Sequence, residues 1–364
     1  MSTMVASVLR QGRLQVDRVP LPDLCHGEVL VRTLACGICG SDIHALHHGP
    51  ELVAGLEKVG SPMKMDLSRD IVMGHEFCGE IVDFGPGAEK RIPVGTRICS
   101  IPFLTRGNRF NHIGYSNEAP GGFGEYMAVS ESTLLEVPNG LSASEAAMTE
   151  PFAVGAHAVA KACLSPDDVP LVVGCGAVGL AVIAMLKRRG AAPIVAADIS
   201  AGRRRLAQQM GADIVVDPNV QSPYEAWSSA AIWEDSSKAP AVPPWETGPA
   251  KRPAVVFECV GIPGMIDRIM AGVPTATRII VVGVCMQTDQ IQPIFGITKE
   301  LDLRFVWGYS PEEYAETLRA IAEGDLSVQP ILSGVTGVSG VADAFSMLSN
   351  GGEQAKIVVE PWRS

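Results

Sequence analysis

The sequence predicts a two-domain α/β protein, with one mainly β part and a second part built on a doubly wound parallel sheet. The chain has 364 residues, more than twice the length of a typical domain. Apolar and polar residues alternate with a period of two over residues 5–35, which is typical of half-buried strands. An apolar run at residues 169–173 precedes a glycine-rich turn and a helical pattern, which indicates the first unit of a parallel sheet.

The composition excludes several classes of protein. With 47% hydrophobic and 19% charged residues, the chain is globular and has a large core. A net charge of −11 without any basic run argues against a nucleic-acid partner. Residues 169–186 carry no charge, but they include a proline and three glycines, so we expect no membrane segment. Nine scattered cysteines and no signal peptide over residues 1–13 predict a cytoplasmic protein with reduced thiols.

Two short segments, residues 36–44 and 74–76, indicate a metal site. The first reads Cys-Gly-Ile-Cys-Gly-Ser-Asp-Ile-His and the second reads Gly-His-Glu. Cys39 offers a thiolate and His75 an imidazole, a pair of ligands that zinc prefers. The alternative is a buried turn with inert cysteines, which Cys39 alone would leave open and which His75 disfavours.

The residues that follow Cys39 suit proton transfer. Ser41 and His44 are a hydroxyl and a titratable ring that could pass a proton from a metal-bound substrate to solvent. Asp42 could orient a histidine ligand through its carboxylate. We expect this motif on a loop, and residues 47–70 to continue as a long polar loop.

These residues resemble the zinc-dependent medium-chain alcohol and polyol dehydrogenases, whose Cys-x-Ser-Asp-x-His and Gly-His-Glu motifs carry the catalytic metal. The resemblance runs over nearly the whole chain. It implies that Cys39 and His75 are zinc ligands and that Ser41 and His44 form the proton relay. Glu76 would lie behind the metal or act as an occasional ligand. The implied fold is a GroES-like, mainly β catalytic domain with a Rossmann cofactor domain.

The resemblance raises two further questions about zinc. Many relatives hold a structural zinc with four closely spaced cysteines, in a lobe that corresponds to residues 99–122. Only Cys99 is present here, so we expect one catalytic zinc and no structural zinc. Polyol-type members have Glu-Pro at Glu150-Pro151, with the carboxylate near the metal. Glu150 is therefore a candidate ligand, although an acid also favours the first turn of a helix.

The apolar strand near residue 171 leads into a Gly-x-Gly-x-x-Gly turn that opens a helix, the context that indicates dinucleotide binding. Gly174 makes the tight turn, Gly176 lets the backbone approach a pyrophosphate, and Gly179 allows close helix–strand packing. The pyrophosphate would lie on the helix N-terminus, at Ala177 and Val178.

A second strand ends at Asp198, nineteen positions after Gly179 (198 − 179). A dinucleotide fold places there the acid that binds the adenosine ribose. Arg203, Arg204 and Arg205 complicate this interpretation, because an arginine nearby can hold the 2′-phosphate of NADP. Asp198 would repel that phosphate, so NAD is expected and NADP is the alternative.

Later strand–turn units continue the parallel sheet, and Val260 and Val284 beside them complete the expected cofactor contacts. We expect the chain to leave this domain after residue 288. The predicted boundaries are therefore 1–151 and 289–364 for the catalytic domain, and 152–288 for the Rossmann domain.

Residues 221–252 form an unusual insertion that is rich in proline and serine. A flexible loop would be the default interpretation, but Trp227, Trp233 and Trp245 lie in it. A solvated linker has no use for three tryptophans. We therefore expect the insertion to pack on the protein's own surface or on a partner subunit.

Together these features predict a zinc-dependent oxidoreductase that transfers a hydride between NAD(H) and a secondary alcohol or diol, or its ketone, at a site between the domains. A sorbitol-like polyol dehydrogenase is one alternative. Another is a zinc-free enone or quinone reductase or a cofactor-sensing protein, which would lack Cys39 and His75. A zinc hydrolase would need histidine at Gly79. We expect a small-molecule substrate and a homodimer or homotetramer.

The substrate expectation depends on the segment after the last predicted crossing strand. Polyol dehydrogenases of the family carry an Arg-Tyr pair there, and the arginine helps to hold the sugar-alcohol hydroxyls. The corresponding pair here is Gly308-Tyr309, preceded by Trp307. Because glycine supplies no donor, we expect a secondary alcohol or small diol over a sorbitol-like polyol.

Overall fold

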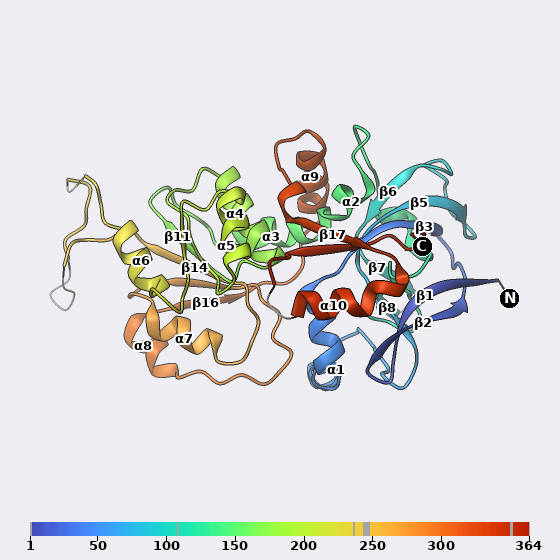
Figure 1. The fold of residues 1–364 in the computed structure, drawn as a ribbon, viewed down its shortest axis with the longest axis horizontal. Helices are drawn as coiled ribbons and strands as arrows, with labels where there is room; N and C mark the ends of the chain where they lie inside the picture. Colours follow the sequence, from blue (N-terminus) through green and yellow to red (C-terminus); the bar gives the residue numbers. More distant parts are fainter. Residues whose placement is uncertain (1, 108, 236, 243–247, 350–351, 364) are drawn as a thin grey trace. The chain divides into compact units, whose positions relative to one another are not determined.

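The computed structural model describes residues 2–107, 109–235, 237–242, 248–349 and 352–363. The chain folds as two compact units, and Figure 1 shows their elements coloured along the sequence. Unit 1 holds residues 1–153 and 310–364, and unit 2 holds residues 154–309. None of the described helices combines the length and the apolar composition that crossing a membrane requires.

Unit 1 is mainly β. Its strands are β1 (Thr3–Arg10), β2 (Arg13–Pro20), β3 (Glu28–Gly37), β4 (Ile71–Val72), β5 (Glu76–Phe84), β6 (Arg97–Ser100), β7 (Phe103–Arg106), β8 (Arg109–His112), β9 (Tyr126–Ser130), β10 (Leu134–Glu136), β17 (Leu332–Thr336) and β18 (Lys356–Val359). The largest sheet runs β10-β6-β5-β3-β18-β17, with β9 also paired to β3. A second sheet runs β2-β1-β4, and β7 with β8 forms a hairpin.

The helices of unit 1 are short apart from α1. They are α1 (Gly40–Lys58), α2 (Ala143–Ala147), α9 (Pro311–Ala322) and α10 (Val341–Ser349), with 3₁₀ turns η1 (Glu131–Thr133), η2 (Gln329–Ile331) and η3 (Val338–Gly340). Helix α3 (Thr149–Lys161) runs across the boundary at residue 153.

Strand β3 is the element on which the site depends, because it pairs with β5, β9 and β18. In these pairings Gly37 lies opposite both Glu76 and Val358. The segments around residues 39, 76 and 356 are therefore brought together at one end of β3, although they are far apart in the sequence.

The metal motif does not lie on a loop, as the sequence led us to expect. Gly40 begins α1, and Cys39 is its N-cap residue. The Asp42 carboxylate accepts a hydrogen bond from the Cys39 backbone N–H at 3.0 Å, which caps the helix. The expected loop over residues 47–70 is helical as far as Lys58. A kink at His48 accompanies Pro50, which cannot donate its i−4 hydrogen bond.

Unit 2 is a doubly wound parallel sheet, as predicted. Its strands are β11 (Val169–Val173), β12 (Val195–Ala197), β13 (Ile214–Val216), β14 (Ala254–Glu258), β15 (Arg278–Val281) and β16 (Asp302–Phe305), in the order β13-β12-β11-β14-β15-β16. Its helices are α4 (Ala177–Arg188), α5 (Ala201–Met210), α6 (Pro223–Ala230), α7 (Met265–Gly272) and α8 (Pro293–Lys299). Figure 1 shows α4 and α5 on one face of this sheet and α7 and α8 on the other.

The chain returns to unit 1 at Ser310, about twenty residues later than the predicted boundary at 289. The reason is β16, which the sequence assigned to the catalytic domain. Its residues pair in parallel register with β15, so that Arg278 lies opposite Asp302 and Val281 opposite Phe305. Strand β16 therefore completes the sheet of unit 2.

Part of the insertion at residues 221–252 is a helix, α6, that belongs to the core of unit 2. Trp227 is 3% exposed and packs among the apolar side chains of β11, β12 and β14. Its indole N–H donates to the Val169 carbonyl at 2.8 Å, which satisfies the buried polar group. Trp233 is half-buried, and Trp245 lies outside the described residues.

Candidate active site

The structure brings together three predicted metal ligands, Cys39, His75 and Glu76, all in unit 1. Their ligand atoms lie within 4.8 Å of one another. Among the described residues, no other three histidine, cysteine or acidic side chains lie as close together. Cys39 precedes α1, while His75 and Glu76 lie at the start of β5. A thiolate, an imidazole and a carboxylate at this spacing fit zinc, which binds sulfur, nitrogen and oxygen donors.

Asp42 selects which nitrogen of His75 is available to a metal. Its Oδ1 lies 3.3 Å from His75 Nδ1, although the two atoms are not aligned as a hydrogen bond and neither has another partner. A metal on Nε2 would leave the proton on Nδ1, facing this carboxylate. Burial alone would lower the pKa of His75, but the Asp42 and Cys39 side chains outweigh it and raise that pKa. The buried, unsatisfied pair therefore fits a ligated histidine.

Glu76 forms a buried ion pair with Lys356, which sequence reasoning missed. Lys356 Nζ lies 2.6 Å from both carboxylate oxygens, and both side chains have no exposed surface. The ammonium also donates to the Ile38 carbonyl at 2.9 Å. Burial by itself lowers the pKa of Lys356, but the Glu76 carboxylate reverses this and raises it. A lone lysine at the start of the apolar strand Lys-Ile-Val-Val was the available signal.

Gly37 is required by this ion pair. A Cβ atom at residue 37 would lie 2.0 Å from Glu76 Oε2, inside the carboxylate. Any side chain there would push Glu76 away from Lys356. The glycine before the metal ligand therefore makes room for the carboxylate, in addition to freeing the backbone.

Ser41 and His44 lie in the first turns of α1, which begins directly after Cys39 of the metal group, the name used here for Cys39, His75 and Glu76. The Tyr115 hydroxyl donates to Ser41 Oγ at 2.9 Å. The Tyr115 ring centroid is 5.4 Å from that of His75, and the His112 ring is 5.5 Å from His75 in an edge-on arrangement. Sequence reasoning missed Tyr115 and His112, because it considered their segment only for the four ligands of a structural zinc.

His112 is held as a neutral ring by its surroundings. Its Nδ1 lies 2.7 Å from the Ile113 carbonyl, and Phe103 and Tyr115 pack edge-on against the ring. Burial, together with the nearby charge of His75, lowers the pKa of His112 to about 3.

Glu150, the fourth candidate ligand, is not a member of the close group. It is 7% exposed and lies in the first turn of α3. Its position agrees with a helix-start role, and a role at the metal stays a prediction.

In unit 2, the glycine-rich turn has the geometry that a pyrophosphate requires. Gly174 has a φ of +93°, and a Cβ at Gly179 would lie 1.9 Å from the Gly174 carbonyl oxygen. Gly176 is the N-cap of α4, and nothing lies within 4 Å of a Cβ built on it. Ala177 and Val178 form the first turn of α4. The open N-terminus of α4 therefore fits an anionic group.

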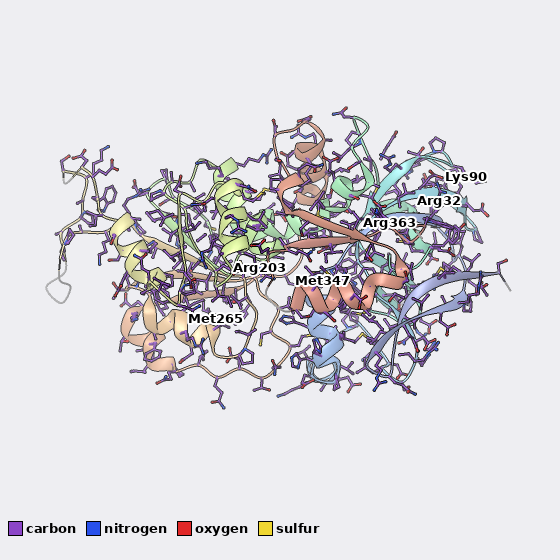
Figure 2. The ribbon with its side chains drawn as sticks, in the orientation of Figure 1. Arg32, Lys90, Arg203, Met265, Met347 and Arg363 are labelled. Carbon is purple, nitrogen blue, oxygen red and sulfur yellow. The ribbon has the colours of Figure 1, made fainter. Side chains whose placement is uncertain are left out.

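Asp198 lies beside this turn and holds it. Its carboxylate accepts hydrogen bonds from the backbone N–H groups of Cys175 and Ser200, each at 2.8 Å. The Arg204 guanidinium forms an ion pair with Asp217 at 2.9 Å and donates a hydrogen bond to the Asp198 backbone carbonyl. Arg203 projects from α5 and is labelled in Figure 2.

A cavity of about 200 Å³ opens at the carboxyl ends of β14, β15 and β16, and Val284 lines it. Glu258 also lines it and accepts the backbone N–H groups of Val260 and Gly261 at 2.7 and 2.9 Å. Burial raises the pKa of Glu258. Ligands of doubly wound sheets bind at this end of the strands.

Comparison with known proteins now decides the family. The family model for the alcohol dehydrogenase GroES-like domain matches residues 25–139, and the zinc-binding dehydrogenase model matches residues 177–323. The (R,R)-butanediol dehydrogenase of Bacillus subtilis strain 168 is 30% identical over 361 residues, which cover 96% of this chain and 97% of that protein. This chain belongs to the zinc-dependent medium-chain dehydrogenase family. The predicted resemblance and fold class are thus confirmed.

Other relatives of this medium-chain dehydrogenase differ in the substrate that they are named for or the cofactor that they bind. The sorbitol dehydrogenase of B. subtilis strain 168 is 27% identical and covers 99% of this chain and 98% of its own length. The solved B. subtilis 2R,3R-butanediol dehydrogenase has a TM-score of 0.76 at 26% identity, covering 98% and 99% of the two chains. A Sinorhizobium meliloti 1021 chain bound to NADP has a TM-score of 0.77 at 25% identity, covering 99% and 100%. The enzyme is therefore an NAD(P)-dependent dehydrogenase that acts on CH–OH groups.

The Lys356–Glu76 pair gives a prediction about stability. Replacing one partner of a buried ion pair leaves the other charge buried and uncompensated, so Lys356→Met should lower the free energy of unfolding by about 3–5 kcal/mol. Adding Glu76→Gln should recover much of this loss. Urea unfolding measures both. Arg91→Met is the matched control, because Arg91 pairs with Glu89 in solvent and should change stability by less than about 1 kcal/mol. A loss in Lys356→Met no larger than in this control would contradict the account.

Proposed function

We propose that the enzyme transfers a hydride between NAD(H) and a secondary alcohol or small diol, with the corresponding ketone as the product. The observation that carries this proposal is the close group of half-buried Cys39 with buried His75 and Glu76, near which Ser41 begins α1. A zinc ion at this group would polarise the substrate oxygen and lower the pKa of its proton, and NAD would accept the hydride. The same group argues against a zinc-free reductase or a cofactor-sensing protein.

Each residue near the metal group has a proposed role. Cys39 and His75 hold the zinc, and Asp42 keeps the His75 ring oriented. Glu76 is an occasional ligand, because Lys356 competes for both of its oxygens. Ser41 takes the proton of the substrate hydroxyl, and His44, one turn further along α1, passes it towards solvent. Glu150 approaches the metal as a ligand or through a water molecule.

The cofactor is proposed to lie along the carboxyl edge of the sheet in unit 2. The pyrophosphate occupies the N-terminus of α4, at Gly176, Ala177 and Val178, and the nicotinamide end contacts Val260 and Val284. NAD is proposed over NADP for two reasons. The Asp198 carboxylate lies beside the turn with capacity for a ribose hydroxyl, and Arg204 is already paired with Asp217.

A polyol dehydrogenase is the second candidate, and a specific observation keeps it open. Sorbitol dehydrogenases are among the relatives that match almost the whole chain. The segment expected to bind polyol hydroxyls favours the diol instead. Gly308 has a φ of +64°, so glycine is used there for its backbone, and Trp307 is 66% exposed.

We also propose that the enzyme forms a homodimer or homotetramer in the cytoplasm. Strand β16 is an edge of its sheet, and its residue Phe305 is 70% exposed. Ile297, on the preceding helix α8, is 72% exposed. Such an apolar edge is typical of a surface that a second copy covers. All nine cysteines are free, which supports a reducing compartment. A sedimentation experiment that gave only monomers at micromolar concentration would contradict the oligomer.

The metal assignment predicts about one zinc per chain. Cys39→Ser should remove the metal and the activity together, because it replaces the thiolate ligand. Ser41→Ala should keep the zinc and lower alcohol oxidation by about 10²–10⁴-fold, the range for loss of general-base transfer. Metal analysis and steady-state kinetics measure these effects. Two zinc ions per chain, or a Ser41→Ala protein without zinc, would show that the assignment is wrong.

The cofactor assignment predicts a higher kcat/KM with NAD than with NADP. In Asp198→Ala the ratio of the two values should shift towards NADP, because the repelling carboxylate is gone. The ratio is the appropriate measure, since the loss of the hydrogen bonds to Cys175 and Ser200 weakens both cofactors. Arg189→Ala serves as the control, because Arg189 is exposed at the C-cap of α4, the opposite end of that helix from the glycine-rich turn. A wild-type preference for NADP would transfer the role to the arginines.

The substrate assignment predicts that butane-2,3-diol has a higher kcat/KM than sorbitol. The reason is the missing donor at Gly308, which would leave a hydroxyl of the longer polyol without a partner when it is desolvated. A bulkier apolar secondary alcohol should also exceed sorbitol if Trp307 contacts the substrate. Sorbitol as the best substrate of the three would favour the polyol dehydrogenase.

A further inference from the structure

The segment over residues 99–122, in which the sequence has a single cysteine, Cys99, lies against the metal group. Strands β7 and β8 form a hairpin in it, and His112 is the last residue of β8. Tyr115 follows in the next turn and is 8% exposed. Both rings contact His75, with centroids 5.5 and 5.4 Å from that of the ligand. The segment therefore forms one wall of the site.

The hydrogen bonds of these two side chains determine what they can still bind. The Tyr115 hydroxyl uses its single proton to donate to Ser41 Oγ, so its oxygen can only accept further bonds. His112 Nδ1 faces the Ile113 carbonyl, which can only accept, so the ring proton lies on Nδ1. Nε2 is then an acceptor, and no described residue donates to it. The wall thus presents two acceptors and no donor.

A hydroxyl suits this wall, because its single proton can be donated to either acceptor, Tyr115 Oη or His112 Nε2. We propose that Tyr115 and His112 form a subsite for a hydroxyl on the carbon adjacent to the one oxidised, which makes them specificity residues for vicinal diols and their hydroxyketones. This inference rests on the proposed function.

The geometry of Ser41 explains why the second hydroxyl would be vicinal. Tyr115 Oη and Ser41 Oγ are 2.9 Å apart, and the reacting hydroxyl lies one hydrogen bond from Ser41 in the proposed reaction. The two oxygens of a gauche vicinal diol are about one hydrogen-bond length apart. A ring of four oxygens can therefore close. It consists of the two hydroxyl oxygens of the diol, Tyr115 Oη and Ser41 Oγ. In this ring the reacting hydroxyl and Tyr115 both donate to Ser41 Oγ, and the second hydroxyl donates to Tyr115 Oη. The proton of Ser41 is not used in the ring and is available to the relay.

Substrates without the second hydroxyl lose this match. A mono-alcohol has no second hydroxyl proton to donate, so the acceptor that a diol would satisfy is left desolvated and unpaired, a situation that sites use to reject analogues. A diketone places a carbonyl oxygen against two acceptors, which is less favourable still. Reduction of 3-hydroxybutan-2-one should therefore be faster, in kcat/KM, than reduction of butane-2,3-dione.

The test compares butane-2,3-diol with butan-2-ol in the full-length zinc enzyme. Tyr115→Phe and His112→Phe each keep an aromatic ring and remove the acceptor. Two quantities are measured: the ratio of kcat/KM values for the two alcohols, and the ratio of their dissociation constants in the complex with NADH, where no hydride can be transferred. Both ratios should favour the diol in the wild type and fall by about 10–100-fold in Tyr115→Phe. His112→Phe should lower them in the same direction, and zinc content should not change.

Tyr126→Phe is the matched control. Tyr126 lies on β9 and packs against Trp362, outside the metal group, so this substitution should leave both ratios unchanged. Equal losses for the two alcohols in Tyr115→Phe would overturn the subsite and leave the proposed function intact. Turnover of neither alcohol by the wild type would defeat the proposed function. The NADH complexes would still decide the subsite in that case, because a diol that binds no tighter than butan-2-ol overturns it.

Discussion

The buried ion pair between Lys356 and Glu76 is the interaction on which the metal group depends. Removing two charges from water is costly, and the cost is offset only when the geometry is good and the remaining hydrogen-bonding groups are satisfied. Here one ammonium serves both carboxylate oxygens and the Ile38 carbonyl, and Gly37 leaves the space that the carboxylate needs. The pair joins β18, close to the C-terminus, to β5 and β3. The last strand of unit 1 therefore fixes a residue of the metal group.

The pair also has an electrostatic consequence for the reaction. Lys356 cancels the negative charge of Glu76, and without it a thiolate and a carboxylate would both face the metal. Excess negative charge at a metal opposes loss of a proton from the substrate oxygen, because the product of that loss is another anion. Holding Glu76 in an ion pair would keep it near a bound metal while limiting this effect. His75, oriented by Asp42, adds a neutral donor.

The residue types of the site could be predicted from the sequence, but its walls could not. Cys39 and His75 were proposed from the chemistry of their side chains and Glu76 from the family resemblance. The structure brings the three within 4.8 Å of one another, and their role as ligands stays a prediction. The requirements at Gly174 and Gly179 are local. Tyr115 and Lys356 acquire a role only through pairings that join distant segments, and a single sequence does not reveal which strands are neighbours.

The errors in element assignment have the same origin. The metal motif and residues 47–70 were assigned to a loop, but Asp42 caps a helix that begins at Gly40 and tolerates Pro50 through a kink. Strand β16 was assigned to the wrong domain, because nothing in its four residues indicates whether β15 or unit 1 is its partner. The insertion that contains Trp227 was expected to pack on the protein's own surface or on a partner subunit. The aromatic side chain of Trp227 instead fills the core beside β11, where its polar N–H finds the Val169 carbonyl.

The central claim is that one zinc ion is held by a single cysteine together with nitrogen and oxygen donors. X-ray absorption at the zinc edge of the metal-loaded enzyme tests this claim most directly, because zinc–sulfur distances of about 2.3 Å are resolved from shorter zinc–nitrogen and zinc–oxygen distances. The account predicts one sulfur per zinc, from Cys39, with nitrogen or oxygen in the other positions. Within the described residues the close group of possible ligands holds one cysteine, so a single sulfur is what this geometry allows. Two or more sulfurs per zinc, or none, would contradict the account.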